Sequence, residues 1–159
     1  MAGNIIRVDH IGIAVADLEE AIRLYTALFG TGPESVEEVP DQSVRTALFR
    51  LGETHVELLC PTSEDSPICG FLAKRGAGIH HICLEVPDLE RALADAKARG
   101  MRLIDEAPRS GARGKRIAFV HPKSTGGVLL EFSETPRGAA CTQHPRAPHA
   151  AGGTPPEES

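Results

Sequence analysis

The sequence is poor in aromatic residues, since it contains no tryptophan and only 4% of its 159 residues are aromatic. No apolar run approaches the roughly 20 residues that a membrane-spanning helix requires, so we expect no membrane contact. Long blocks of Lys and Arg are absent and the formal net charge is −5, which argues against a nucleic-acid partner. The first residues, Met1–Asn4, lack the basic and apolar regions of a secretion signal, so we predict a cytoplasmic protein.

The cysteines share no short spacing of the kind that holds a metal ion or builds a disulfide framework. In a chain without a secretion signal we expect them to be reduced thiols. Hydrophobic residues make up 41% and charged residues 25%, which is ordinary for a globular protein of one domain, or of two small halves sharing a core. The four cysteines are Cys60, Cys69, Cys83 and Cys141.

The chain contains an internal repeat. Residues 10–19 align with residues 81–90, a shift of 71 residues, which is too long for a solenoid unit and indicates a duplicated module. A histidine opens each copy. The identical pairs in this alignment are His10/His81, Ile11/Ile82, Val15/Val86, Asp17/Asp88, Leu18/Leu89 and Glu19/Glu90.

Each copy predicts the order strand, helix, strand, strand, strand, which is an α+β fold. Alternation from Ile5 to Val15 indicates a strand with His10 on the face opposite the apolar residues. Asp17 stands at an N-cap position, and helical spacing continues from there to Gly30. In the second copy Asp88 caps the equivalent helix.

We expect one domain over residues 1–134, with module one at about 4–61, a connector at 62–78 and module two at about 79–134. The connector should contain a short helix over Ile68–Arg75. Residues 135–159 hold five of the twelve prolines and no branched aliphatic or aromatic residue, which predicts a disordered tail. Within module two we predict strands at Leu103–Ile104, Arg116–His121 and Val128–Phe132, and a mobile loop at Ser110–Lys115.

Each module also carries one glutamate in its last strand. The apolar residues on either side of it point to the other face of the strand. A carboxylate inside such a strand is costly to bury unless a positive charge compensates it. A single histidine or glutamate in a strand would more often be packed or solvated, but two matched pairs in a repeat favour a divalent cation site. Mixed imidazole and carboxylate ligands suit Co²⁺, Mn²⁺, Ni²⁺, Zn²⁺ or Fe²⁺. The candidate ligands are His10, Glu57, His81 and Glu131.

The sequence resembles the methylmalonyl-CoA epimerases of the vicinal oxygen chelate superfamily over about residues 4–134. The resemblance implies paired βαβββ modules that form an open eight-stranded cup around a divalent metal, in a homodimer that acts on an acyl-CoA thioester. It implies the same four metal ligands, with Co²⁺ the most expected ion. The motifs that carry it are Val8-Asp-His-Ile-Gly-Ile-Ala-Val15, Val56-Glu-Leu-Leu-Cys-Pro61, Ser66-Pro-Ile-Cys-Gly-Phe-Leu72, Gly78-Ile-His-His-Ile-Cys-Leu-Glu-Val86 and His121-Pro-Lys-Ser-Thr-Gly-Gly-Val-Leu-Leu-Glu131.

The implied reaction removes the proton between a thioester carbonyl and a carboxylate, through an enolate that the metal stabilises. Glu131 is the expected catalytic base. Some relatives place a second acid/base at the position of Thr46, which cannot remove a carbon-bound proton unaided. That role is open among Gln42, Glu57, His121 and a bound water.

Four basic residues are candidates for contacts with the CoA phosphates or with the free carboxylate of the substrate, although each could equally be a solvated surface charge. They are Arg113, Lys115, Arg116 and Lys123. We expect four residues to contact the substrate: Gln42, Lys115, His121 and Lys123.

Other functions on the same scaffold are alternatives. A glyoxalase I-type isomerase would use a similar metal site, whereas an Fe²⁺ dioxygenase would be expected to use three protein ligands. A metal-free binding module has no need of four matched ligand-type residues.

Overall fold

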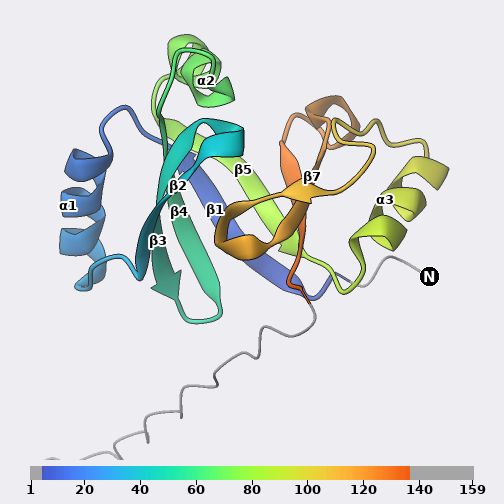
Figure 1. Ribbon diagram of the computed structural model, residues 1–159, viewed down its shortest axis with the longest axis horizontal. Coiled ribbons are helices and arrows are strands. Elements are labelled where there is room, and N and C mark those ends of the chain that lie inside the picture. Colours follow the sequence, from blue (N-terminus) through green and yellow to red (C-terminus); the bar gives the residue numbers. More distant parts are fainter. Residues whose placement is uncertain (1–4, 137–159) are drawn as a thin grey trace, which may run out of the picture.

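The computed structural model describes residues 5–136, and its elements follow the predicted order of two βαβββ modules (Figure 1). The predicted tail lies outside these residues except for Thr135 and Pro136, so the structure does not test its disorder. Module one contains β1 (Arg7–Ala14), α1 (Leu18–Phe29), β2 (Ser35–Val39), β3 (Val44–Leu51) and β4 (Thr54–Pro61). Helix α2 (Pro67–Arg75) connects it to module two, which contains β5 (Gly78–Glu85), α3 (Leu89–Ala98), β6 (Arg109–Ser110), β7 (Arg116–Val120) and β8 (Leu130–Glu134).

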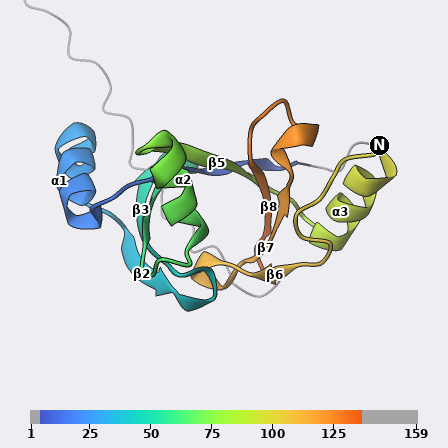
Figure 2. The same ribbon diagram turned by 90° about the horizontal axis from the view of Figure 1, so that it is seen from above.

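All eight strands belong to one sheet with the order β2-β3-β4-β1-β5-β8-β7-β6. Within the modules β1 runs parallel to β4 and β5 runs parallel to β8, while the antiparallel pair of β1 and β5 joins the two modules. The sheet curls so strongly that the strands surround a central space (Figures 1 and 2). The predicted open eight-stranded cup is confirmed.

Helices α1 and α3 lie outside the cup on opposite sides (Figure 2). The Asp17 side chain accepts the backbone N–H of Glu20 at 2.9 Å, as an N-cap does, and Gly30 ends the helix with a φ of 73°. Leu18 and Ala21 of α1 pack on Val56 and Leu58 of β4. Because those two face outward, Glu57 between them faces the inside of the cup.

Helix α2 lies across one end of the cup rather than on its outer side (Figure 2). Its side chains Ile68, Phe71 and Leu72 pack against Val44 and Leu59 of module one. The helix therefore borders the entrance to the interior.

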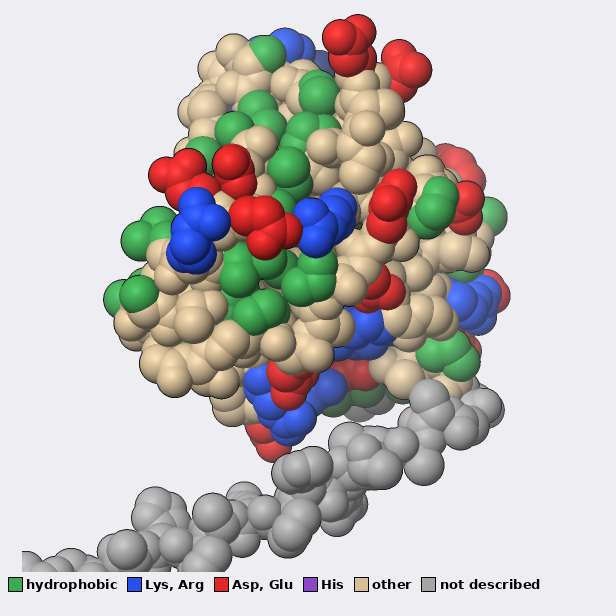
Figure 3. Space-filling model, turned by 60° about the vertical axis from the view of Figure 1, so that its left-hand side comes forward, with side chains coloured by type: hydrophobic (Ala, Val, Ile, Leu, Met, Phe, Trp, Pro, Cys, Tyr) green, Lys and Arg blue, Asp and Glu red, His purple; other side chains and the backbone are tan. Residues whose placement is uncertain are grey.

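The face that carries α1 shows acidic, basic and apolar side chains interspersed, without a block of one charge (Figure 3).

The second module departs from prediction between its helix and its last strand. Leu103 forms only an isolated bridge to Val120, so a strand at Leu103–Ile104 was wrong. Strand β6 begins instead at Arg109, pairs with two residues of β7 at the sheet edge, and leads into a 3₁₀ turn at Ala112–Gly114. So short an edge strand depends on its partner rather than on a pattern of its own.

Strand β8 begins two residues later than expected, because Pro122 to Gly127 form a turn before it. No helix among residues 5–136 is long and apolar enough to cross a membrane.

Candidate metal centre and active site

The four predicted metal ligands converge on the inner face of the cup. The four central strands supply one each: His10 comes from β1, Glu57 from β4, His81 from β5 and Glu131 from β8. All four are buried, with between 3% and 5% of each residue exposed. The repeat therefore places two imidazoles and two carboxylates in one buried cluster.

The ligand-type atoms of this cluster face one another at short range. The Nε2 atoms of His10 and His81 lie 3.0 Å apart. His10 Nε2 is 3.2 Å from Glu57 Oε2, and His81 Nε2 is 3.2 Å from Glu131 Oε2. A cavity of about 20 Å³ lies among them, which is room for a single ion or water.

Gly12 makes this convergence possible. It pairs with Glu57 across β1 and β4, and with His81 across β1 and β5. A Cβ atom built on Gly12 would overlap the imidazole of His81. The His81 ring therefore lies directly over the β1 backbone, and any larger residue at position 12 would displace it.

The donor set fits a divalent cation. The neighbouring donor atoms are 3.0 to 3.2 Å apart, close enough for adjacent donors to contact one ion together. Imidazole nitrogens and carboxylate oxygens together suit ions such as Co²⁺, Mn²⁺, Ni²⁺ and Zn²⁺. His10, His81 and Glu131 each offer a ligand atom within 4.8 Å of the others.

The electrostatics of the cluster also call for a positive charge. Burial disfavours the charged form of His10, but Glu57 and the hydrogen bond to Asp9 outweigh it and raise the pKa of His10 well above its ordinary value. Burial, and then the neighbouring His10, lower the pKa of His81 well below its ordinary value. The opposite directions of these two pKa shifts show that the two rings interact directly, with the carboxylates favouring positive charge in the cluster.

Glu131, the predicted catalytic base, is buried in this cluster. Burial raises the pKa of Glu131 to about 7, with the charge of His10 opposing the shift and that of Glu57 adding to it. Its Oε2 faces His81, while its Oε1 accepts the thiol hydrogen of buried Cys83 at 3.5 Å. A pKa near neutrality suits a carboxylate that must take up and release a proton.

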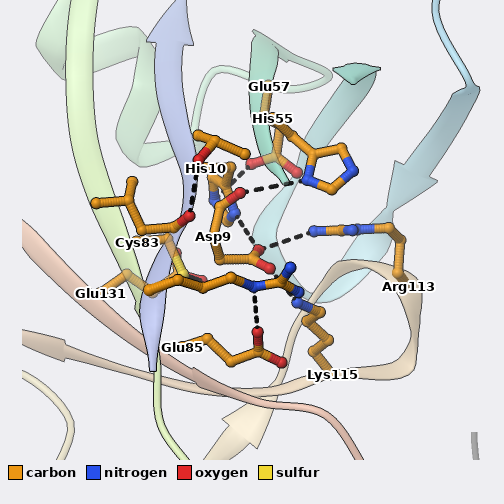
Figure 4. Close-up of polar contacts among 12 residues, drawn as sticks. Asp9, His10, His55, Glu57, Cys83, Glu85, Arg113, Lys115 and Glu131 are labelled. Carbon is orange, nitrogen blue, oxygen red and sulfur yellow. Dashed lines mark hydrogen bonds and ion pairs between the residues drawn. The ribbon is translucent and has the colours of Figure 1, made fainter. Parts of the chain in front are cut away.

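Asp9 is a buried residue that the sequence analysis missed. It is 1% exposed, and its Oδ2 lies 2.8 Å from His10 Nδ1. Lys115 Nζ donates to its Oδ1 at 2.5 Å, and Arg113 donates to its Oδ2 at 3.0 Å (Figure 4). Burial alone would raise the pKa of Asp9, but the hydrogen bonds from His10 and Lys115 hold it well below its ordinary range.

The predicted substrate residues divide into two groups. Gln42 and Lys115 line the small cavity around the ligands, as do Thr46 and Arg113. Lys115 is 9% exposed and directs its ammonium group to Asp9. In the described part of the chain its amine thus faces the interior rather than a surface where CoA phosphates would lie.

The other predicted substrate residues lie apart from this cavity. His121 Nδ1 accepts the backbone N–H of exposed Lys123, and neither residue lines the small cavity or the apolar cavity beside it. The Arg116 guanidinium pairs with Glu90 on α3 and with Glu134 on β8.

A larger, mainly apolar cavity of about 300 Å³ adjoins the cluster at His81 and Gln42. Phe119 forms one wall, and its ring stands edge-on to the His81 ring with 5.6 Å between centroids. The Arg109 guanidinium lies over the Phe119 ring, with its Cζ 5.3 Å from the ring centroid. The start of α2 completes the wall through Pro67 and Ile68, so this cavity connects the buried cluster with the end of the cup.

Comparisons with known proteins agree with this architecture. The family model described as Glyoxalase/Bleomycin resistance protein/Dioxygenase superfamily matches residues 9–119, so the chain belongs to that superfamily. Within it, the chain belongs with the methylmalonyl-CoA epimerases. It is 42% identical to the mitochondrial methylmalonyl-CoA epimerase of Homo sapiens over 132 residues, which cover 82% of this chain and 75% of that protein. It is also 42% identical to the ethylmalonyl-CoA/methylmalonyl-CoA epimerase of Cereibacter sphaeroides, over 80% of this chain and 97% of that protein.

Solved structures give the same result. The methylmalonyl-CoA epimerase of Mycobacterium tuberculosis superimposes with a TM-score of 0.80 at 39% identity, covering 83% of this chain and 89% of that one. A variant of the Streptomyces coelicolor methylmalonyl-CoA epimerase, in complex with 2-nitronate-propionyl-CoA, gives a TM-score of 0.80 at 38% identity, covering 83% and 96%. The resemblance stated from the sequence is confirmed, and so is the vicinal oxygen chelate fold.

Proposed function

We propose that this chain interconverts the two epimers of methylmalonyl-CoA with the help of a divalent metal ion. The observation that carries the proposal is the buried cluster of His10, Glu57, His81 and Glu131, at matched positions of the repeat and beside an apolar cavity. Relatives that match most of the chain are named methylmalonyl-CoA epimerases, and one solved relative is described in complex with methylmalonyl-CoA.

The four side chains would hold the ion, which when bound acts as a Lewis acid and makes the Cα proton of the substrate more acidic. Glu131 takes that proton: the Cα–H bond breaks, its electron pair passes into the enolate, and the proton goes to a carboxylate oxygen. Return of a proton to the opposite face of Cα completes the inversion. The thiol of Cys83 orients Glu131 by donating to its Oε1.

Inversion needs a second proton carrier on the opposite face of the substrate Cα. Thr46, at the position where some relatives have an acid/base, is 3% exposed and lines the same small cavity, but it has no carboxylate. Glu57 is the other carboxylate that lines this cavity, across His10 from Glu131. We therefore place the second proton carrier at Glu57, with the amide of Gln42 as a hydrogen-bonding partner of the substrate.

The choice of ion rests on the resemblance, which favours Co²⁺, with Mn²⁺, Ni²⁺ or Zn²⁺ also compatible with the donors. Four further points remain predictions: a homodimer, a cytoplasmic location, contacts of His121 and Lys123 with the CoA moiety, and a single domain over residues 1–134.

The direct test is exchange of the substrate Cα proton in D₂O, followed by proton NMR with Co²⁺ added and again after chelation. We expect rapid exchange with metal and its loss with chelator. No exchange in the metal-loaded protein would remove the epimerase assignment. Turnover of a glutathione hemithioacetal under the same conditions would instead favour the glyoxalase I-type alternative.

A further inference from the structure

The backbone of β1 departs from regular alternation at Asp9. In the pairing of β1 with β5, Val8 lies opposite Leu84 and His10 lies opposite Cys83, so the register shifts between Val8 and His10. This irregularity is a β-bulge, in which Asp9 has no partner of its own on β5. As a result Asp9 and His10, which are consecutive in the chain, are both buried.

The bulge aims Asp9 at the side of the His10 ring that faces away from the cluster. His10 Nδ1 lies 2.8 Å from Asp9 Oδ2, and its Nε2 faces Glu57 and His81, so a neutral His10 that donates Nδ1–H to Asp9 directs its Nε2 lone pair into the cluster. An imidazole held in this tautomer and orientation needs no rearrangement before it binds a cation.

Asp9 is itself held from the other module. Lys115 and Arg113 both donate to it, and they belong to the segment between β6 and β7. Arg113 has a φ of 57°, in the left-handed region that side chains other than glycine rarely adopt, and this conformation brings its guanidinium inward to Asp9. Figure 4 shows both basic side chains reaching Asp9 from that segment.

We propose that Asp9 is a positioning residue for the metal centre: it fixes the His10 ring for ion binding, and Lys115 and Arg113 fix Asp9. Its role is exerted through His10 rather than through contact with the substrate. This inference rests on the proposed metal site. It adds a residue outside the ligand set that the repeat does not reveal, because the second copy has His80 at the position of Asp9.

The test compares Co²⁺ affinity, measured by competition titration, in three variants and the wild type. Asp9→Ala removes the acceptor for His10 Nδ1–H, and we expect it to weaken Co²⁺ binding by about 10- to 100-fold. Asp9→Asn keeps an acceptor oxygen at the same place, so we expect it to restore most of the affinity. The visible absorption of the bound Co²⁺ should differ from wild type in Asp9→Ala and resemble wild type in Asp9→Asn.

Asp17→Ala is the matched control, because it removes the N-cap of α1 and lowers the melting temperature without touching the cluster. It should leave the Co²⁺ affinity unchanged, which separates a positioning effect from a general loss of stability. If Asp9→Ala binds Co²⁺ within twofold of wild type, or if Asp9→Asn is as weak as Asp9→Ala, the positioning role is overturned. If the wild type binds no Co²⁺, the metal site and this inference both fail.

Discussion

At the scale of single residues, Gly12 controls how closely the two modules bring their ligands together. The His81 imidazole occupies the space where a side chain at position 12 would begin. We expect Gly12→Ala to displace His81, to lower the free energy of unfolding by about 1–3 kcal/mol through overpacking, and to weaken divalent ion binding by at least about tenfold. Calorimetric titration and chemical unfolding measure the two effects.

Gly70→Ala is a matched control, since Gly70 lies within α2 and its Cβ would meet nothing within 4 Å. Alanine in a helix should raise stability by about 0.5–1 kcal/mol and leave the ion affinity unchanged. An affinity of Gly12→Ala equal to that of Gly70→Ala would contradict the assignment of His81 as a ligand held over the β1 backbone.

Glu131 carries the second prediction at this scale. Glu131→Gln keeps an oxygen that can contact the ion but loses the group that accepts a proton. We therefore expect kcat to fall by about 10²- to 10⁴-fold, with ion affinity changed by less than about tenfold. Exposed Glu53→Gln, in the turn between β3 and β4, should behave as wild type. A fully active Glu131→Gln would show that the base lies elsewhere.

At the scale of elements, the segment between β6 and β7 is bound to β1 through ion pairs rather than through strand pairing. Lys115→Met would leave Asp9 buried with one cationic partner fewer. We expect it to cost roughly 1–3 kcal/mol of unfolding free energy. The double variant Asp9→Asn/Lys115→Met should lose less than the sum of the single changes, because the two side chains interact directly. Urea unfolding of the metal-free proteins would check this, and strict additivity would contradict the direct pair.

Strands β1 and β5 show how much of the site the sequence could predict. Alternation along β1 and the repeat were enough to place His10 and His81 inside the cup, since regular strands and their copies obey local rules. Regular alternation would place Asp9 on the face opposite His10, but the bulge leaves both side chains buried. A bulge depends on how β1 pairs with β5, so no pattern within β1 alone reveals it.

The same limit explains the errors in module two. The edge strand β6 exists through two pairs with β7, and the segment after it takes its shape from the contacts of Lys115 and Arg113 with Asp9. These contacts join residues more than 100 positions apart in the chain. The basic residues of this segment were therefore assigned to the CoA phosphates or the substrate carboxylate, whereas in the fold two of them face a buried carboxylate.

At the scale of the whole molecule, a bound ion would link the two modules, because each module supplies one histidine and one glutamate. Ion binding should then stabilise the protein as one unit. At a free Co²⁺ concentration 100 times the Kd, we expect the free energy of unfolding to rise by about 2.7 kcal/mol, and to return to the lower value after chelation. Unfolding should remain a single transition in both states. A rise confined to one of two separate transitions would contradict a shared site.

The most direct measurement is a crystal structure grown with excess Co²⁺, with the ion located by its anomalous scattering. We predict one strong peak per chain at about 2.0–2.3 Å from His10 Nε2, His81 Nε2 and one carboxylate oxygen each of Glu57 and Glu131. A peak at other residues, or no peak between these four side chains at saturating Co²⁺, would contradict the metal centre on which the proposed epimerase chemistry depends.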